Sequence, residues 1–227
     1  YLAAQKKTII KSRFVVDMRS INSCLEDNCH PLPLMDVFRR DVAHGYTHFS
    51  AFDGTSYFHQ FSVSRSTSKL MTICCLNRIF VFRRLLMGCK NSPGLTQGFG
   101  DRAFRCHGAT KPFLDDFTVR SKGMETHLKK DLPIFLALCS FYRILLKGSK
   151  SDIAVPTARI LGHECAASSL SLTGEKVKKI EKLEFPQTKK QLVSCLALFS
   201  YFLQLSPRLA ELIAPLRKYA PSSLGLV

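Results

Sequence analysis

The sequence predicts an α+β fold in which strands and helices mix up to about residue 172 and only helices follow. Short runs of residues that favour strands alternate with segments of helical periodicity through the first part of the chain. From Gly174 onward the apolar positions follow helical spacing alone, and Pro186 and Pro207 mark the joints between the helices. No Gly-rich loop joins a strand to a helix, which disfavours the runner-up, a doubly wound α/β fold.

Hairpins and helices alternate in the first half of the chain. Apolar runs bounded by turn residues predict the strands, and apolar residues at helical spacing predict the helices. In order, the expected elements are a hairpin over residues 1–18, a helix that opens at Met35 and ends at Gly45, a strand over 48–53, a hairpin over 72–84 with its turn at Asn77 and Arg78, and a helix from Ser92 to about residue 107.

The second half is expected to open with a hairpin at Asp115 and Asp116, followed by a helix from about Glu125 to Tyr142. Spacings of three and four residues define the buried stripe of that helix as Leu128, Leu132, Phe135, Leu136, Cys139 and Tyr142. A short strand and turn over 159–163 come next. The apolar positions of the terminal helices are Val177, Ile180, Leu183, Leu192, Leu196, Phe199 and Phe202.

The composition indicates a globular protein with a large positive charge. Hydrophobic residues make up 46% and charged residues 22% of the 227 residues, which argues against disorder. Lys and Arg number 33 against 17 Asp and Glu, and the net charge of +16 indicates a polyanionic partner, nucleic acid before membrane. No apolar run approaches the roughly 20 residues that a membrane span requires.

The nine cysteines are scattered without the regular spacing of a disulfide framework. They indicate reduced thiols in a cytosolic or nuclear protein. Cys24, Cys29 and His30 invite a zinc interpretation, but no second pair of ligands at finger-like spacing follows, so we expect no zinc site.

Asp115 and Asp116 are adjacent and lie between apolar flanks in a strongly basic chain. Adjacent carboxylates repel, and burying one is costly unless it is paired or binds a metal. Taken alone, the pair favours a hairpin turn, because Asp is a common turn residue. Asp53, at the end of the expected strand over 48–53, supplies a third acid. Three such carboxylates predict a two-metal site for nucleotidyl transfer, with hard oxygen ligands for Mg²⁺.

Six stretches in collinear order resemble the reverse transcriptase of long-terminal-repeat retrotransposons of the Ty3/gypsy type, which is related to retroviral reverse transcriptase. They are RFVVDMRSIN at 13–22, PLP at 31–33, SAFDGTSYFHQ at 50–60, LMGCKNSP at 86–93 through Gln97, FLDD at 113–116, and Lys150 with LGH at 161–163. The helices from residue 199 to 216 are similar to those that precede the family's next domain. The resemblance therefore extends over nearly the whole chain.

The resemblance implies a right-hand polymerase fold, with an antiparallel sheet and helices in the palm, partial fingers and a helical thumb. Residues 1–27 and 61–91 would be fingers, 28–60 and 92–172 palm, and 173–227 thumb or connection helices. The implied activity is that of an RNA-directed and DNA-directed DNA polymerase, which joins a dNTP to a primer 3′-hydroxyl. The chain would begin inside the fingers and stop before any RNase H domain.

Two alternatives to this activity remain. One is a catalytically inactive or domesticated nucleic-acid-binding remnant, and the other is an RNA-dependent RNA polymerase, against which Phe58 argues. The sequence also departs from the family's pattern. Phe113 stands where Tyr is usual, Tyr57 stands where Gly is usual, and Met87, Cys89 and Thr96 replace larger or different residues.

The resemblance assigns roles to individual residues. It implies two Mg²⁺ ions, for which Mn²⁺ could substitute, held by Asp53, Asp115 and Asp116 with the Gly54 carbonyl assisting. The incoming nucleotide would meet Lys6 or Lys7, Lys11, Arg13, the steric gate Phe58, Met87 and Gln97. Template and primer would contact Asp17, Arg19, Asn22, Lys90, Pro93, Phe113, Leu114 and Gly162. Lys150 would donate a proton to pyrophosphate, unless it is a solvated loop lysine, and Phe58 could also be a core aromatic.

The resemblance further implies the partners and the location. The expected partners are a template–primer duplex of RNA or DNA, a dNTP, and the RNase H and integrase portions of a parent polyprotein, with no membrane. The expected location is the cytoplasm, within virus-like particles, or the nucleus. One series of lysines would follow the duplex backbone from the thumb, or would form a solvated face: Lys176, Lys178, Lys179, Lys182, Lys189 and Lys190.

Overall fold

The computed structural model describes residues 16–27, 30–167, 169–172, 174, 178, 181–203 and 207–219. The expected hairpin over 1–18 lies outside these ranges except for its last three residues. Residues 16–18 form no strand, because Val16 and Met18 pack with Met71, Leu86 and Cys89 in a small apolar cluster. The predicted strand is therefore wrong over its described part.

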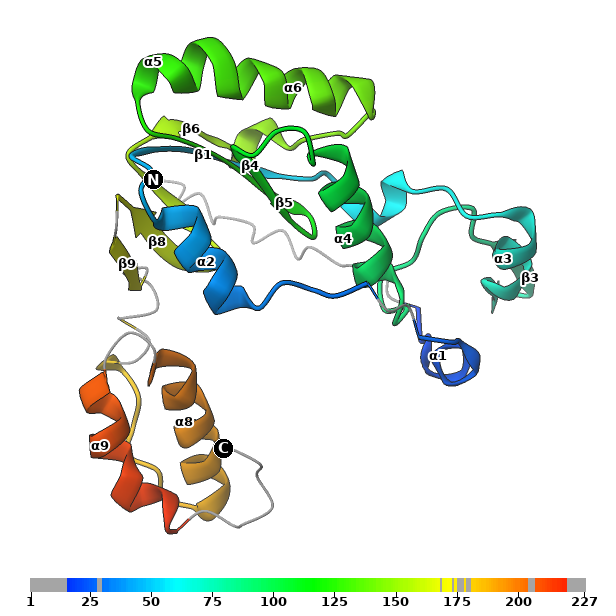
Figure 1. The fold of residues 1–227 in the computed structure, drawn as a ribbon. Helices are drawn as coiled ribbons and strands as arrows, with labels where there is room; N and C mark the ends of the chain where they lie inside the picture. Colours follow the sequence, from blue (N-terminus) through cyan, green and yellow to red (C-terminus); the bar gives the residue numbers. More distant parts are fainter. Residues whose placement is uncertain are drawn as a thin grey trace, which may run out of the picture.

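A four-stranded antiparallel sheet forms the centre of the fold (Figure 1). Its strand order is β4 (Thr110–Phe113), β5 (Asp116–Ser121), β1 (His48–Asp53) and β6 (Asp152–Val155). β1 and β5 pair over their full length, from His48 opposite Ser121 to Asp53 opposite Asp116. The expected strand over 48–53 is confirmed. β6 was not expected, because its four residues carry no alternation of apolar and polar side chains.

Side chains of the central sheet alternate between its two faces, and each face is covered by helices. Phe52 lies on one face and stacks on Phe135 at a ring distance of 4.9 Å. Phe49 lies on the other face, in a cluster with Phe38 of α2 (Met35–Ala43). Asp53 is four residues after Phe49 in the strand, so it lies on the same face as Phe49. The acidic end of β1 therefore faces away from Phe135.

The long helix expected over 125–142 is present but contains a π turn. It consists of α5 (Met124–Thr126), the π segment η2 (His127–Asp131) and α6 (Leu132–Phe141). The π turn shifts the buried face by one residue, so that His127 is buried and Leu128 is 46% exposed. The expected stripe is thus confirmed at Leu132, Phe135 and Cys139 and wrong at Leu128, Leu136 and Tyr142.

The helix expected from Ser92 is α4 (Ser92–Ala103), which ends four residues before the predicted boundary. Phe104 leaves the helix and packs its ring on Phe117 and Phe135 at 5.5 and 5.4 Å. Tertiary packing thus ends the helix earlier than its sequence periodicity suggests. α2 ends as predicted, because Gly45 adopts a positive φ of 76° after its last turn.

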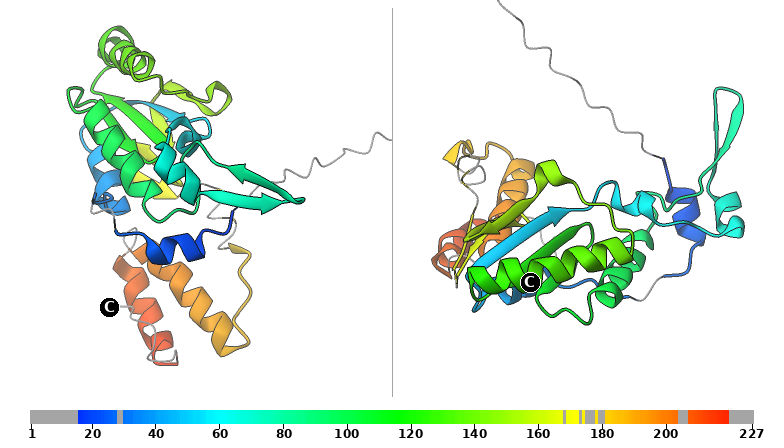
Figure 2. Two further views of the ribbon diagram at one scale, coloured as in Figure 1. Left: turned by 90° about the vertical axis from the view of Figure 1, so that its right-hand side faces the viewer. Right: turned by 90° about the horizontal axis from the view of Figure 1, so that it is seen from above.

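The hairpin expected over 72–84 extends away from the central sheet (Figure 2). It consists of β2 (Thr72–Cys75) and β3 (Arg78–Val81). Its turn lies at Leu76 and Asn77, which both have positive φ, rather than at Asn77 and Arg78. Two consecutive positive φ values are typical of the tight turn that matches strand twist. Short helices flank this region: α1 (Arg19–Cys24), η1 (Tyr57–Gln60) and α3 (Arg65–Leu70).

A second, three-stranded sheet follows η3 (Gly148–Lys150) and β6. Its strands are β7 (Thr157–Ile160), β8 (His163–Ala166) and β9 (Ser169–Leu172), paired in chain order. The strand and turn expected over 159–163 are confirmed. The change to helices after residue 172 is also confirmed in the described part of the C-terminal region, which contains α8 (Lys189–Phe202) and α9 (Pro207–Arg217).

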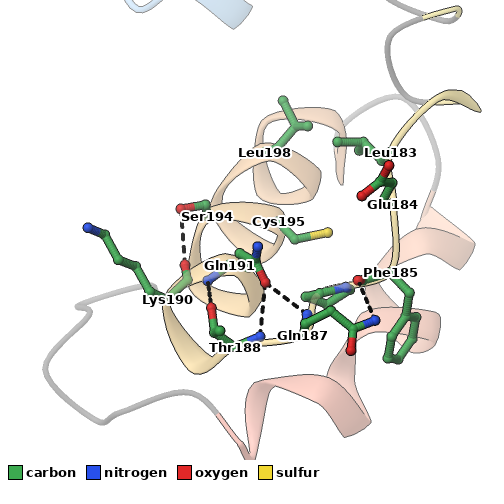
Figure 3. A pocket seen from close by; sticks show the side chains of 11 residues that line it. Leu183, Glu184, Phe185, Gln187, Thr188, Lys190, Gln191, Ser194, Cys195 and Leu198 are labelled. Carbon is green, nitrogen blue, oxygen red and sulfur yellow. Dashed lines mark hydrogen bonds between the residues drawn. The ribbon is translucent and has the colours of Figure 1, made fainter.

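α8 begins at a capping box (Figure 3). The Thr188 hydroxyl accepts the Gln191 backbone N–H, and the Gln191 side chain accepts the backbone N–H groups of Gln187 and Thr188. The segment before this cap is extended, so Leu183, expected in a helix, lies in a coil and is 43% exposed. A hollow of about 600 Å³ lies between this segment and α8.

None of the helices that the structure describes is long and apolar enough to cross a membrane. The described cysteines form no disulfide.

Candidate active site

The three predicted acidic residues lie at one end of the β1–β5 pair. Asp53 is the last residue of β1 and Asp116 is the first residue of β5, and the register places them directly opposite each other. Asp115 precedes Asp116 in the turn after β4, and its backbone carbonyl accepts the Gly54 N–H at 2.7 Å. The hairpin prediction is confirmed, with one refinement. The turn residues are Leu114 and Asp115, whereas Asp116 already belongs to the strand.

Little space is left for a side chain at Gly54. A Cβ at this position would lie 3.0 Å from Cδ2 of Tyr57 and 3.2 Å from the carbonyl oxygen of Asp115. Tyr57, which stands where the family has Gly, is 2% exposed and packs edge-on against Phe61 and Phe117. The departure at Tyr57 therefore fills the core below the site rather than the site itself.

Gln97 of α4 holds the β4–β5 turn in place. Its side-chain carbonyl accepts the Leu114 N–H at 2.8 Å, and its amide donates to the Pro112 carbonyl at 3.0 Å and to Asp101 at 2.9 Å. The residue is 1% exposed. We expected Gln97 to face the nucleotide or template. Its burial and its occupied amide replace that expectation with a positioning role for the Asp115 turn.

The acids lie in an environment that opposes their ionisation. Burial raises the pKa of Asp116 to about 6, with the carboxylates of Asp115 and Asp53 adding to the rise. Burial also raises the pKa of Asp115, again with a contribution from Asp53. Asp116 keeps contact with solvent, which screens part of this repulsion. A site that raises the pKa of two acids favours a cation close to them.

Lys150 already supplies one positive charge. Its Nζ lies 3.0 Å from Oδ2 of Asp53, and its charge lowers the pKa values of Asp115 and Asp116. The prediction placed Lys150 at the reaction centre, and the structure brings it there from η3. This contact argues against a lysine that is merely solvated.

The donor set suits a divalent cation such as Mg²⁺. Asp53, Asp115 and Asp116 offer the oxygen ligands that such an ion prefers. Within the described residues, however, no three His, Cys, Asp or Glu side chains converge as a ready-made metal cluster. Mg²⁺ is usually held by one or two carboxylates together with substrate phosphates, so an incomplete protein cage is compatible with this ion.

A cavity of about 330 Å³ opens beside Asp53 and Asp116. Four of its lining residues were not expected from the sequence: Ser149, Ser151, Asp152 and Arg159. Arg159 lies on β7 directly opposite Glu164 of β8 but forms no ion pair with any described residue. The sequence offers no signal for these residues, because β7 reaches the cavity only through the contact between the two sheets.

Phe58, five residues after Asp53, lies in η1 and is partly exposed, as a contact with a sugar requires. Met87 is 45% exposed, and Pro93 lies in the first turn of α4. Leu114 lies at the turn with a φ of 52°, and Gly162 is exposed with a φ of 74° in the β7–β8 turn. Contact of these residues with nucleotide or nucleic acid stays a prediction.

Phe113 does not lie at the surface. It is 5% exposed and its ring packs 5.1 Å from that of Phe38. The alternation of β4 directs the Phe113 ring into the core. Contact of Phe113 with the primer stays a prediction.

Around α1 and the 88–90 loop, the predicted nucleic-acid residues bind one another. Asn22 donates to the Gly88 carbonyl at 2.8 Å and accepts the Lys90 N–H at 2.9 Å, which ties α1 to the 88–90 loop. Lys90 also pairs with Asp27 at 3.0 Å. Asp17 and Arg19 form an exposed pair at 2.7 Å.

Some of the predicted basic residues lie outside the described residues. These are Lys6, Lys7, Lys11, Arg13, Lys176 and Lys179. The other four lysines expected to follow the duplex are exposed: Lys178, Lys182, Lys189 and Lys190.

The family model for reverse transcriptase (RNA-dependent DNA polymerase) matches residues 4–165. The chain is 27% identical over 206 residues to the retrovirus-related Pol polyprotein from transposon opus of Drosophila melanogaster. This match covers 90% of this chain and 20% of that protein. It is 28% identical over 211 residues to the enzymatic polyprotein of cauliflower mosaic virus (strain Strasbourg), which covers 91% of this chain and 30% of that protein. The chain thus spans a fifth to a third of such polyproteins.

Two solved structures share the fold. The foamy viral protease-reverse transcriptase dRH in complex with double-stranded DNA has a TM-score of 0.85 at 21% identity, over 91% of this chain and 36% of that chain. The same viral protein in complex with an RNA/DNA hybrid has a TM-score of 0.78 at 20% identity, over 90% of this chain and 28% of that chain. The expected right-hand polymerase fold is therefore confirmed. Since the family match extends over most of the sequence, the chain belongs to the reverse transcriptase family.

Proposed function

We propose that this chain is the polymerase core of a retroelement polyprotein, an RNA-directed and DNA-directed DNA polymerase that extends a primer with dNTPs. One observation carries the proposal. Asp53 lies directly opposite Asp116 in the β1–β5 register, and the Gly54–Asp115 hydrogen bond holds the third acid beside them. Family membership supports the same reaction.

In the proposed reaction the primer 3′-oxygen forms a bond to the α-phosphorus of the dNTP, and the bond from that phosphorus to the pyrophosphate oxygen breaks. Asp53 and Asp115 would be the principal metal ligands, with Asp116 and the Gly54 carbonyl assisting. Mg²⁺, or Mn²⁺ in its place, supplies positive charge at the attacking and leaving oxygens when bound. The packed rings of Phe52 and Phe117 beneath the acids keep water from that side of the site.

Lys150 would give a proton to the departing pyrophosphate. Its contact with Asp53 places the ammonium group at the site before substrates arrive. The ammonium group has three donor hydrogens, so it can contact Asp53 and a pyrophosphate oxygen at the same time.

The substrates proposed for the chain are a template–primer duplex and dNTPs. A net charge of +16 supports the duplex, because phosphate contacts by Lys and Arg dominate such binding. The relatives are polyproteins, which supports further domains in a parent protein. We propose that RNase H and integrase portions are among them. We propose that the reaction takes place in the cytoplasm, within virus-like particles.

Primer extension on a poly-ribonucleotide template tests the proposal. Wild type and Asp115→Asn are compared, with Glu125→Gln as a control that removes an equal charge from an exposed helix site. We expect extension by wild type and the control and a loss of about 1000-fold or more in Asp115→Asn. Template–primer binding should stay within about twofold. Equal incorporation in wild type and Asp115→Asn contradicts the proposal.

A nucleic-acid-binding remnant without catalysis is the second candidate. The Lys150–Asp53 pair and the absence of a three-ligand cluster among the described residues favour it. The same assay separates the two functions. If the chain is a remnant, wild type and Asp115→Asn bind the duplex equally well, and neither extends a primer at any Mg²⁺ or Mn²⁺ concentration.

A further inference from the structure

His127 links the two strands that carry the acids, on the face of the sheet opposite the site. It lies in the π turn η2 and is fully buried. Its Nε2 is 2.7 Å from Oγ of Ser50 in β1, and its Nδ1 is 2.8 Å from Oγ of Ser121 in β5. No step of the proposed reaction uses this imidazole. Its position behind the sheet therefore requires a separate explanation.

The hydrogen-bond directions in this network follow from counting protons. The Ser121 hydroxyl donates its one proton to Oδ2 of Asp131 at 2.6 Å, so Ser121 must accept from Nδ1–H of His127. A neutral imidazole then has a free lone pair on Nε2, which accepts the Ser50 hydroxyl. Ser50 uses its own lone pair to accept the Ala154 N–H at 2.9 Å. The hydroxyl groups of Ser50 and Ser121 and both ring nitrogens are all paired in this network when His127 is neutral with its proton on Nδ1.

This network joins three strands of the central sheet. Ser50 lies in β1 three residues before Asp53, and Ser121 is the last residue of β5, at the end remote from Asp116. The β1–β6 register shifts between Phe49 and Ala51, and Ser50 bonds across that irregularity to β6. A one-residue slip would move Asp53 to the other face of the sheet, away from Asp116.

We propose that His127 is a positioning residue for Asp53 and Asp116: its neutral imidazole bridges Ser50 and Ser121 and fixes the register of the two strands that carry the acids. This inference rests on the proposed function for its effect on catalysis. Its effect on strand pairing stands without that function.

Protonation of His127 would break the network. Nε2 would become a donor, so Ser50 would have to accept from both Nε2 and Ala154 and would lose the acceptor for its own proton. Burial lowers the pKa of His127, with Asp131 opposing the shift and His48 adding to it. The neutral form is thus favoured at neutral pH and is lost as pH falls.

Other groups near the network are also titratable. Nε2 of His107 lies 3.6 Å from Oδ1 of Asp131, and its Nδ1 is 2.7 Å from the Thr110 hydroxyl. Burial lowers the pKa of His107, with Asp131 opposing the shift and Lys130 adding to it. A variant of His127 alone therefore separates its protonation from that of His107.

The test compares wild type with His127→Phe, which fills the space without polar atoms, and His127→Asn, which keeps a donor towards Ser121. Val42→Ala, in the cluster on the other face, controls for general loss of stability. Amide hydrogen exchange of residues 48–53 and 116–121 is measured at about pH 7.5 and about pH 6 and corrected for intrinsic rates. Primer extension gives kcat and the KM for dNTP.

We expect His127→Phe to exchange these amides about tenfold faster than Val42→Ala at about pH 7.5, with His127→Asn between them. Wild type should lose protection at about pH 6, and His127→Phe, which keeps only His107 of the two buried histidines, should lose less. The His127 variants that lose more exchange protection should also have the lower kcat, and their affinity for the template–primer should be unchanged. Ser121→Ala replaces His127→Phe if the latter does not fold, with the same expectation at about pH 7.5.

The inference is overturned if His127→Phe, or Ser121→Ala in its place, matches Val42→Ala in exchange at both pH values. The exchange measurement needs no turnover. An inactive wild type would therefore contradict the proposed function and leave this result intact.

Discussion

Lys150 has two roles in the proposed site, as counter-ion of Asp53 and as proton donor to pyrophosphate. Replacing it by Gln removes both the charge and the proton. We predict that Lys150→Gln lowers kcat about 100-fold, because proton transfer to a leaving group contributes about that factor or more. The KM for dNTP should change little. Single-turnover primer extension measures both quantities.

Lys147→Gln is the matched control for Lys150→Gln, since it removes an exposed lysine from the same segment. Its kcat should stay within about twofold of wild type. If the two variants behave alike, Lys150 acts only through the general charge of this segment.

Phe58 gives the second prediction at this scale. As a steric gate it would reject a ribose 2′-hydroxyl, so Phe58→Ala should raise ribonucleotide incorporation relative to deoxyribonucleotide about tenfold or more. Competition between the two nucleotides during primer extension measures the ratio. Phe61→Ala is the control, because Phe61 packs on Tyr57 and Phe99 in the core. Phe61→Ala should lower stability and leave the ratio unchanged. If Phe58→Ala also lowers stability and leaves the ratio unchanged, Phe58 is purely structural and the prediction is contradicted.

The sequence predicted the acidic residues of the site better than the residues that surround them and hold them in position. Asp53, Asp115 and Asp116 could be found because metal chemistry requires carboxylates and the motif order fixes which ones. Gln97 was found but its bonds to the β4–β5 turn were not, and Arg159 was missed. Amides, hydroxyls and guanidinium groups occur in many settings, so only the tertiary structure shows what they touch.

At the scale of elements, the link between α4 and the β4–β5 turn is open to test. Gln97→Met keeps the volume and removes the bonds to Leu114 and Pro112. We predict a stability loss of about 1–3 kcal/mol, because buried backbone groups lose their partners. kcat should fall about tenfold as Asp115 loses its fixed position. Urea unfolding and primer extension measure these two effects.

The KM for dNTP separates this role from direct contact. A positioning residue lowers kcat and leaves this KM within about twofold, whereas a residue that touches the nucleotide raises it. A large rise in KM with unchanged stability would restore the original assignment of Gln97.

Element predictions succeeded where the signal was local. The strand over 48–53 and the helix after Met35 were correct because periodicity and a terminal glycine define them. The π turn at His127–Asp131 could not be read from spacing, since it depends on tertiary packing that brings His127 to Ser50 of β1 as well as to the nearby Ser121. β6 pairs with β1 across about a hundred residues, and no local pattern encodes such pairing.

For the whole molecule, the fold class followed from the order of elements and the resemblance, but the arrangement of the two sheets did not. The active-site cavity depends on that arrangement, because β1 and β5 supply the acids and β7 supplies Arg159. Composition alone gave the charge of +16 and hence a polyanionic partner. The acids of the candidate site add a local cost to stability, which pH can reveal.

Asp116 and the two buried histidines have opposite effects on stability as pH falls. The folded pKa values of His107 and His127 lie below 6.5, so the unfolded chain binds more protons and stability falls as pH drops through 6.5. The folded pKa of Asp116, about 6, lies above its ordinary value of 3.8, so the folded chain binds more protons between those values. Its ionised form therefore destabilises the fold above about pH 6, and acidification removes that cost.

Asp116→Asn should therefore be more stable than wild type at neutral pH, by about 1 kcal/mol after allowance for solvent screening. The difference should persist at higher pH and shrink as pH falls from about 6 towards 4, because wild-type Asp116 then becomes neutral as well. Urea unfolding across this range measures it, with Glu125→Gln as a control for the change of charge. An Asp116→Asn variant that is less stable than wild type at neutral pH would show that the acid is held by favourable contacts. The ionised Asp116 carboxylate would then not destabilise the fold.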